Sequence, residues 1–207
     1  MIPDRKIMII GGHGKVGQSI TKELKNYCLI LAGRNEEKMK RFIQKEQLKA
    51  EICVMDILHI DFALLQNVGW IIVCVDQENT LLVEYCDKNG IDYMDVTANS
   101  EYIDKIRRLE LNGTSKILLG IGLAPGLTNL LAEQLLRNPK FGSDIFIVSI
   151  QSGKKSLYAW GHDEGRFTGL IAAESAKRMA DSTLKKGIME ISDIMTAEEI
   201  INNVCFS

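Results

Sequence analysis

The glycine-rich stretch near the start of the chain restricts the fold more than any other feature. The apolar run at residues 6–10 is followed by Gly12, Gly14 and Gly17, which have the G-x-G-x-x-G spacing. We expect Gly12 to turn the chain sharply off a strand, Gly14 to leave room for a diphosphate, and Gly17 to let a helix lie close to the sheet. The start of that helix offers free N–H groups and partial positive charge to an anion. The stretch predicts a dinucleotide-binding strand–turn–helix unit; a plain glycine-rich turn is the alternative.

Short apolar runs alternate with amphipathic segments over the first two thirds of the chain. The pattern predicts strands at 5–10, 28–32, 51–55, 70–75, 91–95 and 116–120. It predicts helices at 15–27, from Asn35 onward, near 58–67, at 78–89 and at 99–112. Such alternation implies right-handed crossovers and a parallel sheet. We therefore predict an α/β fold, a Rossmann-type doubly wound parallel sheet.

The pattern changes after about residue 140. Apolar strands at 144–151 and 157–160 flank a turn and predict an antiparallel hairpin, and a long helix is expected at 167–186. Residues 196–199 read as a capping box that opens a last short helix. We therefore predict a Rossmann domain at 1–139 and a short region of hairpin and closing helices at 140–207. The hairpin has few expected neighbours, so we expect residues 140–165 to form a homodimer interface.

Composition and charge exclude several classes of function. The 207 residues include 25 basic and 27 acidic side chains, and no strongly basic face stands out, so nucleic acid is not expected as a partner. The apolar runs are too short for a membrane helix, and the N-terminus has no signal-peptide pattern. The five cysteines are scattered without a C-x-x-C pair. We expect a cytoplasmic protein with reduced cysteines and no metal site.

The residues after the second strand indicate which cofactor is preferred. An acidic residue at this place hydrogen-bonds the ribose 2′-hydroxyl of NAD. Here Gly33 and Arg34 occupy it, and no carboxylate occurs before Glu36. Arg34 can bind a phosphate through two parallel hydrogen bonds, and Lys38 can add a second charge. The sequence therefore favours NADP(H) over NAD(H), although Arg34 could instead stack on an adenine or lie in a solvated loop.

Other residues of the predicted cofactor site follow the strand ends. Asp56 is expected to meet the adenine edge or to cap a helix, and Cys74 and Val75 to border the nicotinamide half. His13 either contacts the diphosphate or ribose or is simply an exposed side chain. The full predicted cofactor set is Gly11, Gly12, His13, Gly14, Lys15, Val16, Gly17, Arg34, Asn35, Lys38, Asp56, Ile57, Cys74 and Val75.

The sequence does not assign a catalytic residue. Hydride transfer needs orientation and a proton donor, and the candidates are Asp76, Tyr93, Asp95 and His162. Asp76 could orient a ribose hydroxyl or cap a helix. Tyr93 and Asp95, expected to face opposite ways, could equally be a core tyrosine and a strand-end cap. His162 could be a general acid or belong to an exposed loop.

Several segments together resemble the saccharopine dehydrogenase / saccharopine reductase family. They are the glycine loop 11–17, Ala32–Asn35 with Lys38, Gly90–Thr97, the Pro-Gly-Leu-Thr-Asn segment within 122–129, and 165–176. The resemblance implies an NADP-binding Rossmann domain and an oxidoreductase that makes or breaks a secondary amine between two amino-acid-like parts. Family members carry a substantial substrate domain where this chain has only about residues 140–165.

Two hypotheses follow from the sequence. The first is an NADP(H)-dependent oxidoreductase that acts on a small amino-acid-derived or imine substrate. The second is a non-catalytic NADP(H)-binding redox sensor or interaction module, which the short second region motivates.

Overall fold

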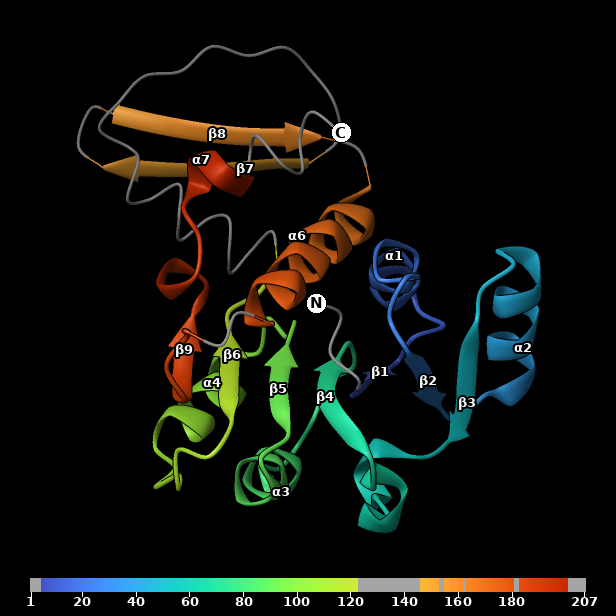
Figure 1. Ribbon diagram of the computed structural model, residues 1–207. Coiled ribbons are helices and arrows are strands. Elements are labelled where there is room, and N and C mark those ends of the chain that lie inside the picture. Colours follow the sequence, from blue (N-terminus) through green and yellow to red (C-terminus); the bar gives the residue numbers. More distant parts are fainter. Residues whose placement is uncertain (1–4, 123–145, 153–154, 162, 181–182, 201–207) are drawn as a thin grey trace.

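A seven-stranded parallel sheet forms the centre of the computed structural model (Figure 1). The structure describes residues 5–122, 146–152, 155–161, 163–180 and 183–200. The strand order is β3-β2-β1-β4-β5-β6-β9. The strands are β1 Lys6–Ile10, β2 Leu29–Gly33, β3 Ala50–Val54, β4 Val68–Val73, β5 Asp92–Asp95, β6 Lys116–Leu119 and β9 Gly187–Glu190. This confirms the predicted doubly wound α/β sheet, whose order reverses between β1 and β4.

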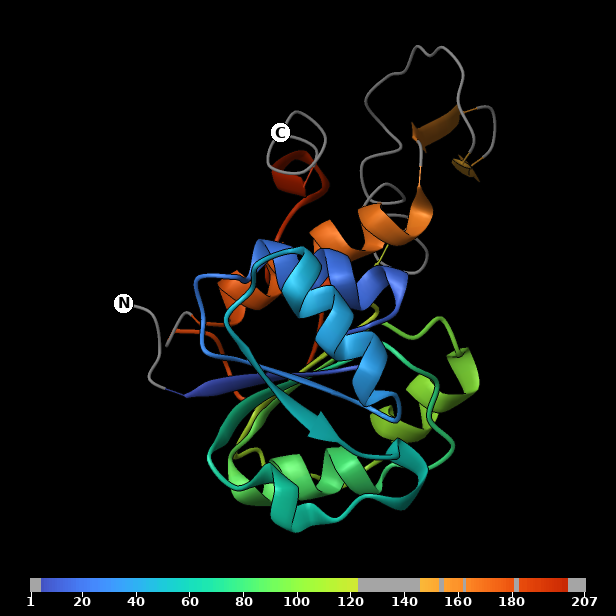
Figure 2. The same cartoon turned by 90° about the vertical axis from the view of Figure 1, so that its right-hand side faces the viewer.

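Helices cover both faces of the sheet. They are α1 Lys15–Glu23, α2 Glu36–Lys45, α3 Leu81–Asn89, α4 Ser100–Arg107, α6 Glu164–Met179 and α7 Ala197–Ile200, with 3₁₀ turns η1 Ile57–His59, η2 Phe62–Leu65 and η4 Ile191–Asp193. In Figure 2, α1, α2 and α6 lie on one side of the sheet and α3 and α4 on the other. The helix predicted near 58–67 is therefore two 3₁₀ turns, and the one predicted at 99–112 ends at Arg107.

The alternation of side chains along the strands divides the core into two layers. Ile7 and Ile9 of β1 pack in the layer under α1 and α6, whereas Met8 and Ile10 pack in the layer under α3 and α4. All four are almost completely buried. A strand that is buried on both faces reads as a continuous apolar run, which is why the central strands were identifiable from sequence.

The last strand of the sheet was not predicted. The helix expected at 167–186 instead begins at Glu164 and ends at Met179, and Gly187–Glu190 forms β9 beside β6. A strand of four residues carries little pattern of its own, so the sequence did not reveal it. The β9 strand gives the edge of β6 backbone hydrogen-bond partners, and the Gly187 amide donates to the Ser115 carbonyl at 2.7 Å.

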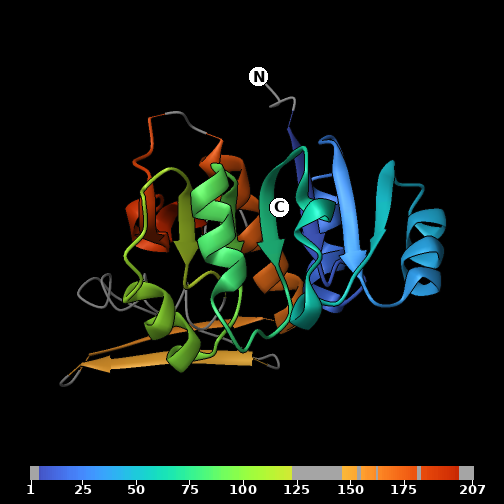
Figure 3. The same ribbon diagram turned by 90° about the horizontal axis from the view of Figure 1, so that it is seen from below.

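The predicted hairpin is confirmed. Strands β7 Phe146–Ser152 and β8 Lys155–Gly161 pair antiparallel, from Phe146 opposite Gly161 to Ser152 opposite Lys155. Figures 1 and 3 show this two-stranded ribbon beyond the carboxyl ends of the β5 and β6 strands. After it, the chain returns as α6 and β9 to the main sheet. No helix among the described residues is long and apolar enough to span a membrane.

Close contact between α6 and α1 explains the small residues on α6. A Cβ atom added at Gly169 of α6 would clash with the Ser19 side chain and lie 3.0 Å from the Val16 carbonyl oxygen of α1. Ala172, Ala173 and Ala176 of α6 are buried.

The C-terminal capping box is also confirmed. The Glu199 amide donates to Thr196 Oγ1 at 3.2 Å, and the Thr196 amide donates to Glu199 Oε2 at 2.7 Å.

Candidate functional site

The glycine loop between β1 and α1 makes its sharp turn one residue earlier than expected. Gly11 has a φ of +82°, in the left-handed region, and a Cβ atom there would lie 2.6 Å from Val75 Cγ1. Gly12 was predicted to make the turn. Its glycine is required for a different reason, because a Cβ atom there would lie 2.7 Å from Leu31 Cδ2. The loop is therefore pressed between the ends of β2 and β4.

The start of α1 is open toward the ligand side. A Cβ at Gly17 would press against the Gly11 carbonyl oxygen and lie 2.6 Å from Gly12 Cα, so this glycine brings the helix onto the turn as predicted. At Gly14, the N-cap residue, the nearest atom to an added Cβ is the Gly11 carbonyl oxygen at 3.3 Å. The first turn of α1 has no acidic residue and no side-chain cap. Its N–H groups suit an anion such as a diphosphate.

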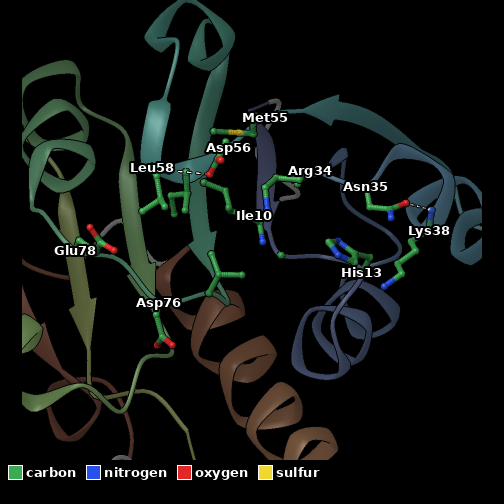
Figure 4. A pocket seen from close by; sticks show the side chains of 14 residues that line it. Ile10, His13, Arg34, Asn35, Lys38, Met55, Asp56, Leu58, Asp76 and Glu78 are labelled. Atoms are coloured by element: carbon green, nitrogen blue, oxygen red, sulfur yellow. Dashed lines mark hydrogen bonds between the residues drawn. The ribbon is translucent and has the colours of Figure 1, made fainter.

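A cavity of about 580 Å³ lies where the strand order reverses (Figure 4). Ligands of open α/β sheets bind at such a point, beyond the carboxyl ends of the strands. The lining residues come from the ends of four strands and the loops after them. They are Ile10, Gly11, His13, Gly33, Arg34, Asn35, Lys38, Met55, Asp56, Ile57, Leu58, Val75, Asp76 and Glu78.

Eight of the residues predicted to bind cofactor line this cavity. They are Gly11, His13, Arg34, Asn35, Lys38, Asp56, Ile57 and Val75. Those outside the lining are Gly12, Gly14, Lys15, Val16, Gly17 and Cys74. Sequence reasoning named Gly33 only as a neighbour of Arg34, and it missed Ile10, Met55, Leu58 and Glu78. Each of these lies at a strand end or in the segment that follows, which is the signal that could have found them.

Three basic side chains gather at one side of the cavity. Figure 4 shows Arg34, His13 and Lys38 on this side and Asp76 and Glu78 on the opposite side. Among the described residues, neither Arg34 nor Lys38 forms an ion pair. Two cations without a protein anion, beside an open helix start, suit a phosphate.

The start of α2 fixes the backbone of the basic side. Asn35, where the sequence predicted the helix to start, is the N-cap, and its Oδ1 accepts a hydrogen bond from the Lys38 amide at 2.9 Å. Glu36 and Glu37, the first carboxylates after β2, lie 2.9 and 3.5 Å from the Lys40 ammonium. Lys40 therefore offsets the two negative charges that follow Arg34.

His13 is a packed part of the cavity wall and not merely an exposed side chain. Its Cε1 and Nδ1 atoms lie 3.1 Å from the position that a Cβ of Gly33 would take. Its Nδ1 is buried without a hydrogen-bond partner among the described residues. Partial burial, together with the charges of Lys38 and Arg34, lowers the pKa of His13 below 6.5.

The rest of the cavity combines apolar walls with one positioned carboxylate. Ile10, Met55 and Leu58 line it, and Asp56 is held by the Leu58 amide, which donates to Asp56 Oδ1 at 3.1 Å. Asp56 thus both caps the η1 turn and lines the cavity, so both of its expected roles remain compatible with the structure. Apolar walls with a hydrogen-bond acceptor at the rim suit an adenine ring and its exocyclic amine.

A buried polar cluster lies behind the cavity at the end of β5. The Tyr93 hydroxyl donates to Asp95 Oδ2 at 2.5 Å, and Gln77 Nε2 donates to the same oxygen at 2.7 Å. The prediction that Tyr93 and Asp95 face opposite ways was wrong, because residues two apart on a strand share a face. Both are buried and outside the cavity lining, whereas Asp76 lines it. His162 and the segment 123–129 lie outside the described residues.

Burial dominates the protonation of this cluster. It raises the pKa of Asp95 to about 6, against the opposing effect of hydrogen bonds from Tyr93, the Thr97 amide and Gln77. Burial also raises the pKa of the Cys74 thiol. Cys74 is therefore protonated and unreactive at neutral pH, and it is one of four described cysteines that are free thiols.

Comparison with known proteins identifies the family. The family described as "Saccharopine dehydrogenase NADP binding domain" matches residues 7–115, which is more than half of the chain. The chain belongs to this family. NADP is accordingly its cofactor, as the residues after β2 predicted. No curated protein matches the sequence significantly.

Solved structures share the fold at low sequence identity. AtPrR2 with NADP+ and (+)pinoresinol is 13% identical, with a TM-score of 0.52 over 98% of this chain and 75% of that one. Apo saccharopine dehydrogenase (L-Glu forming) from Saccharomyces cerevisiae is 16% identical, with a TM-score of 0.48 over 64% of this chain. This match covers 32% of the yeast chain.

Proposed function

We propose that the protein is an NADP(H)-dependent oxidoreductase of the saccharopine dehydrogenase type, acting on a small amino-acid-derived or imine substrate. The basic side of the cavity supports this proposal most directly. Arg34 and Lys38 have no anionic partner among the described residues and stand where other dinucleotide folds place a carboxylate. A ribose 2′-phosphate is the anion that fits this place.

The other parts of the cavity suit the rest of the cofactor. In this proposal, Gly12, Gly14, Lys15, Val16 and Gly17 hold the diphosphate at the start of α1. The apolar walls and Asp56 hold the adenine, while Cys74 and Val75 border the nicotinamide half. When bound, NADP(H) supplies or accepts the hydride; the chain orients it and excludes water.

The proton donor must come from a residue close to the cofactor. Of the three catalytic candidates that the structure describes, Asp76 lines the cavity, and Tyr93 and Asp95 are buried behind it. Thr97 Oγ1 lies 3.5 Å from Asp76 Oδ1, and the Thr97 amide donates to Asp95 Oδ1 at 2.7 Å. We therefore place Asp76 nearest to the chemistry and assign Tyr93 and Asp95 to supporting its loop.

Cofactor titration tests the assignment of the basic side. NADPH and NADH are titrated by fluorescence against the wild type, Arg34→Ala and the control Arg41→Ala, an exposed residue on the same α2 helix. We expect NADPH to bind better than NADH. Loss of charge-assisted hydrogen bonds worth about 2 kcal/mol should weaken NADPH binding in Arg34→Ala by roughly 30-fold. Equal wild-type affinities, or no loss in Arg34→Ala, would contradict the proposal.

A non-catalytic NADP(H)-binding sensor or interaction module is the alternative. It is favoured by the short stretch 140–165, where the family resemblance implies a larger substrate domain. A structure with bound NADP would distinguish the two: a closed pocket facing the nicotinamide supports the enzyme, and an open ring washed by solvent supports the sensor. A screen for NADPH consumption with amino acids plus oxo acids would then search for the substrate.

We also propose that a cytoplasmic homodimer forms through residues 140–165. An isolated two-stranded ribbon is at best marginally stable in water, and β7 and β8 pair only with each other among the described residues. Pairing across a two-fold axis would cover such edges. Size-exclusion chromatography with light scattering is expected to give the mass of a dimer, and a monomer would refute this proposal.

A further inference from the structure

The position of His13 indicates a role that the glycine-loop motif does not give it. The residue is one of the variable positions of the motif, yet its ring fills the space beside Gly33 at the end of β2. A larger residue at Gly33 would displace the ring, since an added Cβ would be 3.1 Å from two ring atoms. Gln18 Nε2 donates to the His13 carbonyl at 2.9 Å and so holds the backbone of the same residue. The end of β2, through Gly33, and α1, through Gln18, thus hold His13 at the basic side of the cavity.

The charged side chains on the basic side of the cavity, where the His13 ring lies, are positive. Arg34 follows β2 and Lys38 belongs to α2, and both charges act on the His13 ring. The acidic residues of the cavity, Asp56, Asp76 and Glu78, follow β3 and β4, and Figure 4 shows Asp76 and Glu78 on the far side. Without a ligand, partial burial first, and then the charges of Lys38 and Arg34, lower the pKa of His13 and so favour the neutral imidazole, whose buried Nδ1 has no hydrogen-bond partner among the described residues.

A phosphate dianion bound between Arg34 and Lys38 reverses this balance. The two positive charges are then neutralised, and the phosphate oxygens offer acceptors to a protonated ring. We propose that His13 is a third residue of the 2′-phosphate site and that NADP(H) binding takes up one proton there from the solvent. This inference rests on the proposed function, because it requires the 2′-phosphate to lie at the basic side. In the balanced step, neutral imidazole plus a proton gives imidazolium, and no covalent bond to the cofactor forms or breaks.

The proton uptake predicts how the affinity for NADPH changes with pH. The complex binds the proton more tightly than the free protein, so affinity for NADPH falls as pH rises through the range between the two His13 pKa values. The fall is up to about tenfold per pH unit within that range. Affinity for NADH, which lacks the 2′-phosphate, should not show this fall.

Isothermal titration calorimetry measures the uptake directly. NADPH is titrated at about pH 7.5, where a phosphate with a second pKa of about 6 is already a dianion, in two non-phosphate buffers of small and large ionisation enthalpy. We expect the wild type to take up a substantial fraction of one proton with NADPH and none with NADH. His13→Gln should abolish the uptake and still bind NADPH, more weakly. His59→Gln, a control whose side chain is 85% exposed, should keep the uptake.

The outcomes separate this inference from the function on which it rests. Tight NADPH binding with the same enthalpy in both buffers, or uptake that persists in His13→Gln, overturns the role of His13 and leaves the NADP site intact. No preference for NADPH overturns the proposed function itself. If His13→Gln does not fold, an NMR titration of the wild-type histidines with and without NADP+ decides instead. A His13 pKa that does not rise with NADP+ refutes the proposal.

Discussion

Asp95 offers a direct test of how burial sets the energetics behind the cavity. Its Oδ1 accepts from the Thr97 amide, and its Oδ2 accepts from the Tyr93 hydroxyl and Gln77 Nε2. The carboxyl is almost completely buried, and burial raises its pKa from 3.8 to about 6. Replacing Asp95 by Asn removes this titration and retains the shape of the side chain.

The sign and size of the effect follow from the two pKa values. The folded state binds the Asp95 proton more tightly than the unfolded state, so the neutral carboxyl favours folding. This contribution is complete below pH 3.8 and is lost as pH rises through about 6. The difference in pKa corresponds to about 3 kcal/mol, at roughly 1.4 kcal/mol per unit.

The cluster can accept an amide at this position. The Asn oxygen can still accept from the Thr97 amide, and its NH₂ group can donate to the Tyr93 oxygen. The Tyr93 hydroxyl can then turn to Tyr102, whose oxygen lies 3.3 Å away. Reversal of the Gln77 amide presents an oxygen instead of a second donor. The pH dependence of the difference between the two proteins therefore reports the charge.

Urea unfolding at a series of pH values measures this difference. Relative to the wild type, Asp95→Asn should become more stable by about 3 kcal/mol as pH rises from about 4 to about 7, and then remain level. The control Asp104→Asn removes an exposed carboxylate that lies 3.0 Å from the Arg107 guanidinium and should not show this rise. Parallel stability curves for the wild type and Asp95→Asn would refute the reasoning.

Two further substitutions test the glycine turn and a loop anchor. Gly17→Ala places a methyl against the Gly11 carbonyl and 2.6 Å from Gly12 Cα, so thermal unfolding should show a loss of about 1–3 kcal/mol, with weaker NADPH binding in titration; unchanged values for both would contradict the close approach. The buried Asp87 carboxylate accepts from the Asn112, Thr114 and Ser115 amides, and these bonds outweigh burial and lower its pKa. Asp87→Asn should therefore lower the unfolding free energy at neutral pH by about 1–3 kcal/mol, and the wild-type advantage should disappear as pH falls through the lowered pKa; a constant advantage down to low pH would argue against the anchor.

The sequence predicted the parts of the fold that depend on local patterns. The central strands, such as Ile7–Ile10, are buried on both faces and so appear as uninterrupted apolar runs. The helix start at Asn35 was identifiable because the capping side chain and the first turn are adjacent in sequence. β9 was missed because its partner, β6, lies about 70 residues earlier, and a strand of this length carries little pattern of its own.

The cavity was predictable in its basic side and less so elsewhere. Arg34 and Lys38 follow a strand at a characteristic distance from the glycine loop, and this spacing indicates the residues that meet the adenosine ribose. Met55 and Glu78 could have been marked by their positions after strands, but the tertiary arrangement is what brings the four strand ends to one cavity. The contact between His13 and Gly33 joins the glycine loop to the end of β2 and could not be predicted from either position alone.

Because β6 and β9 are neighbours in the sheet, the segment between them can vary separately from the cofactor-binding strands. The backbone leaves the sheet after Leu119 and comes back beside the same strand at Gly187, after α6 has docked on α1. A segment that leaves the sheet and returns beside the same strand can become longer or shorter without shifting any other strand. The hairpin thus occupies an insertion point, where covers of different size can be grafted over the carboxyl edge while the nucleotide half stays unaltered.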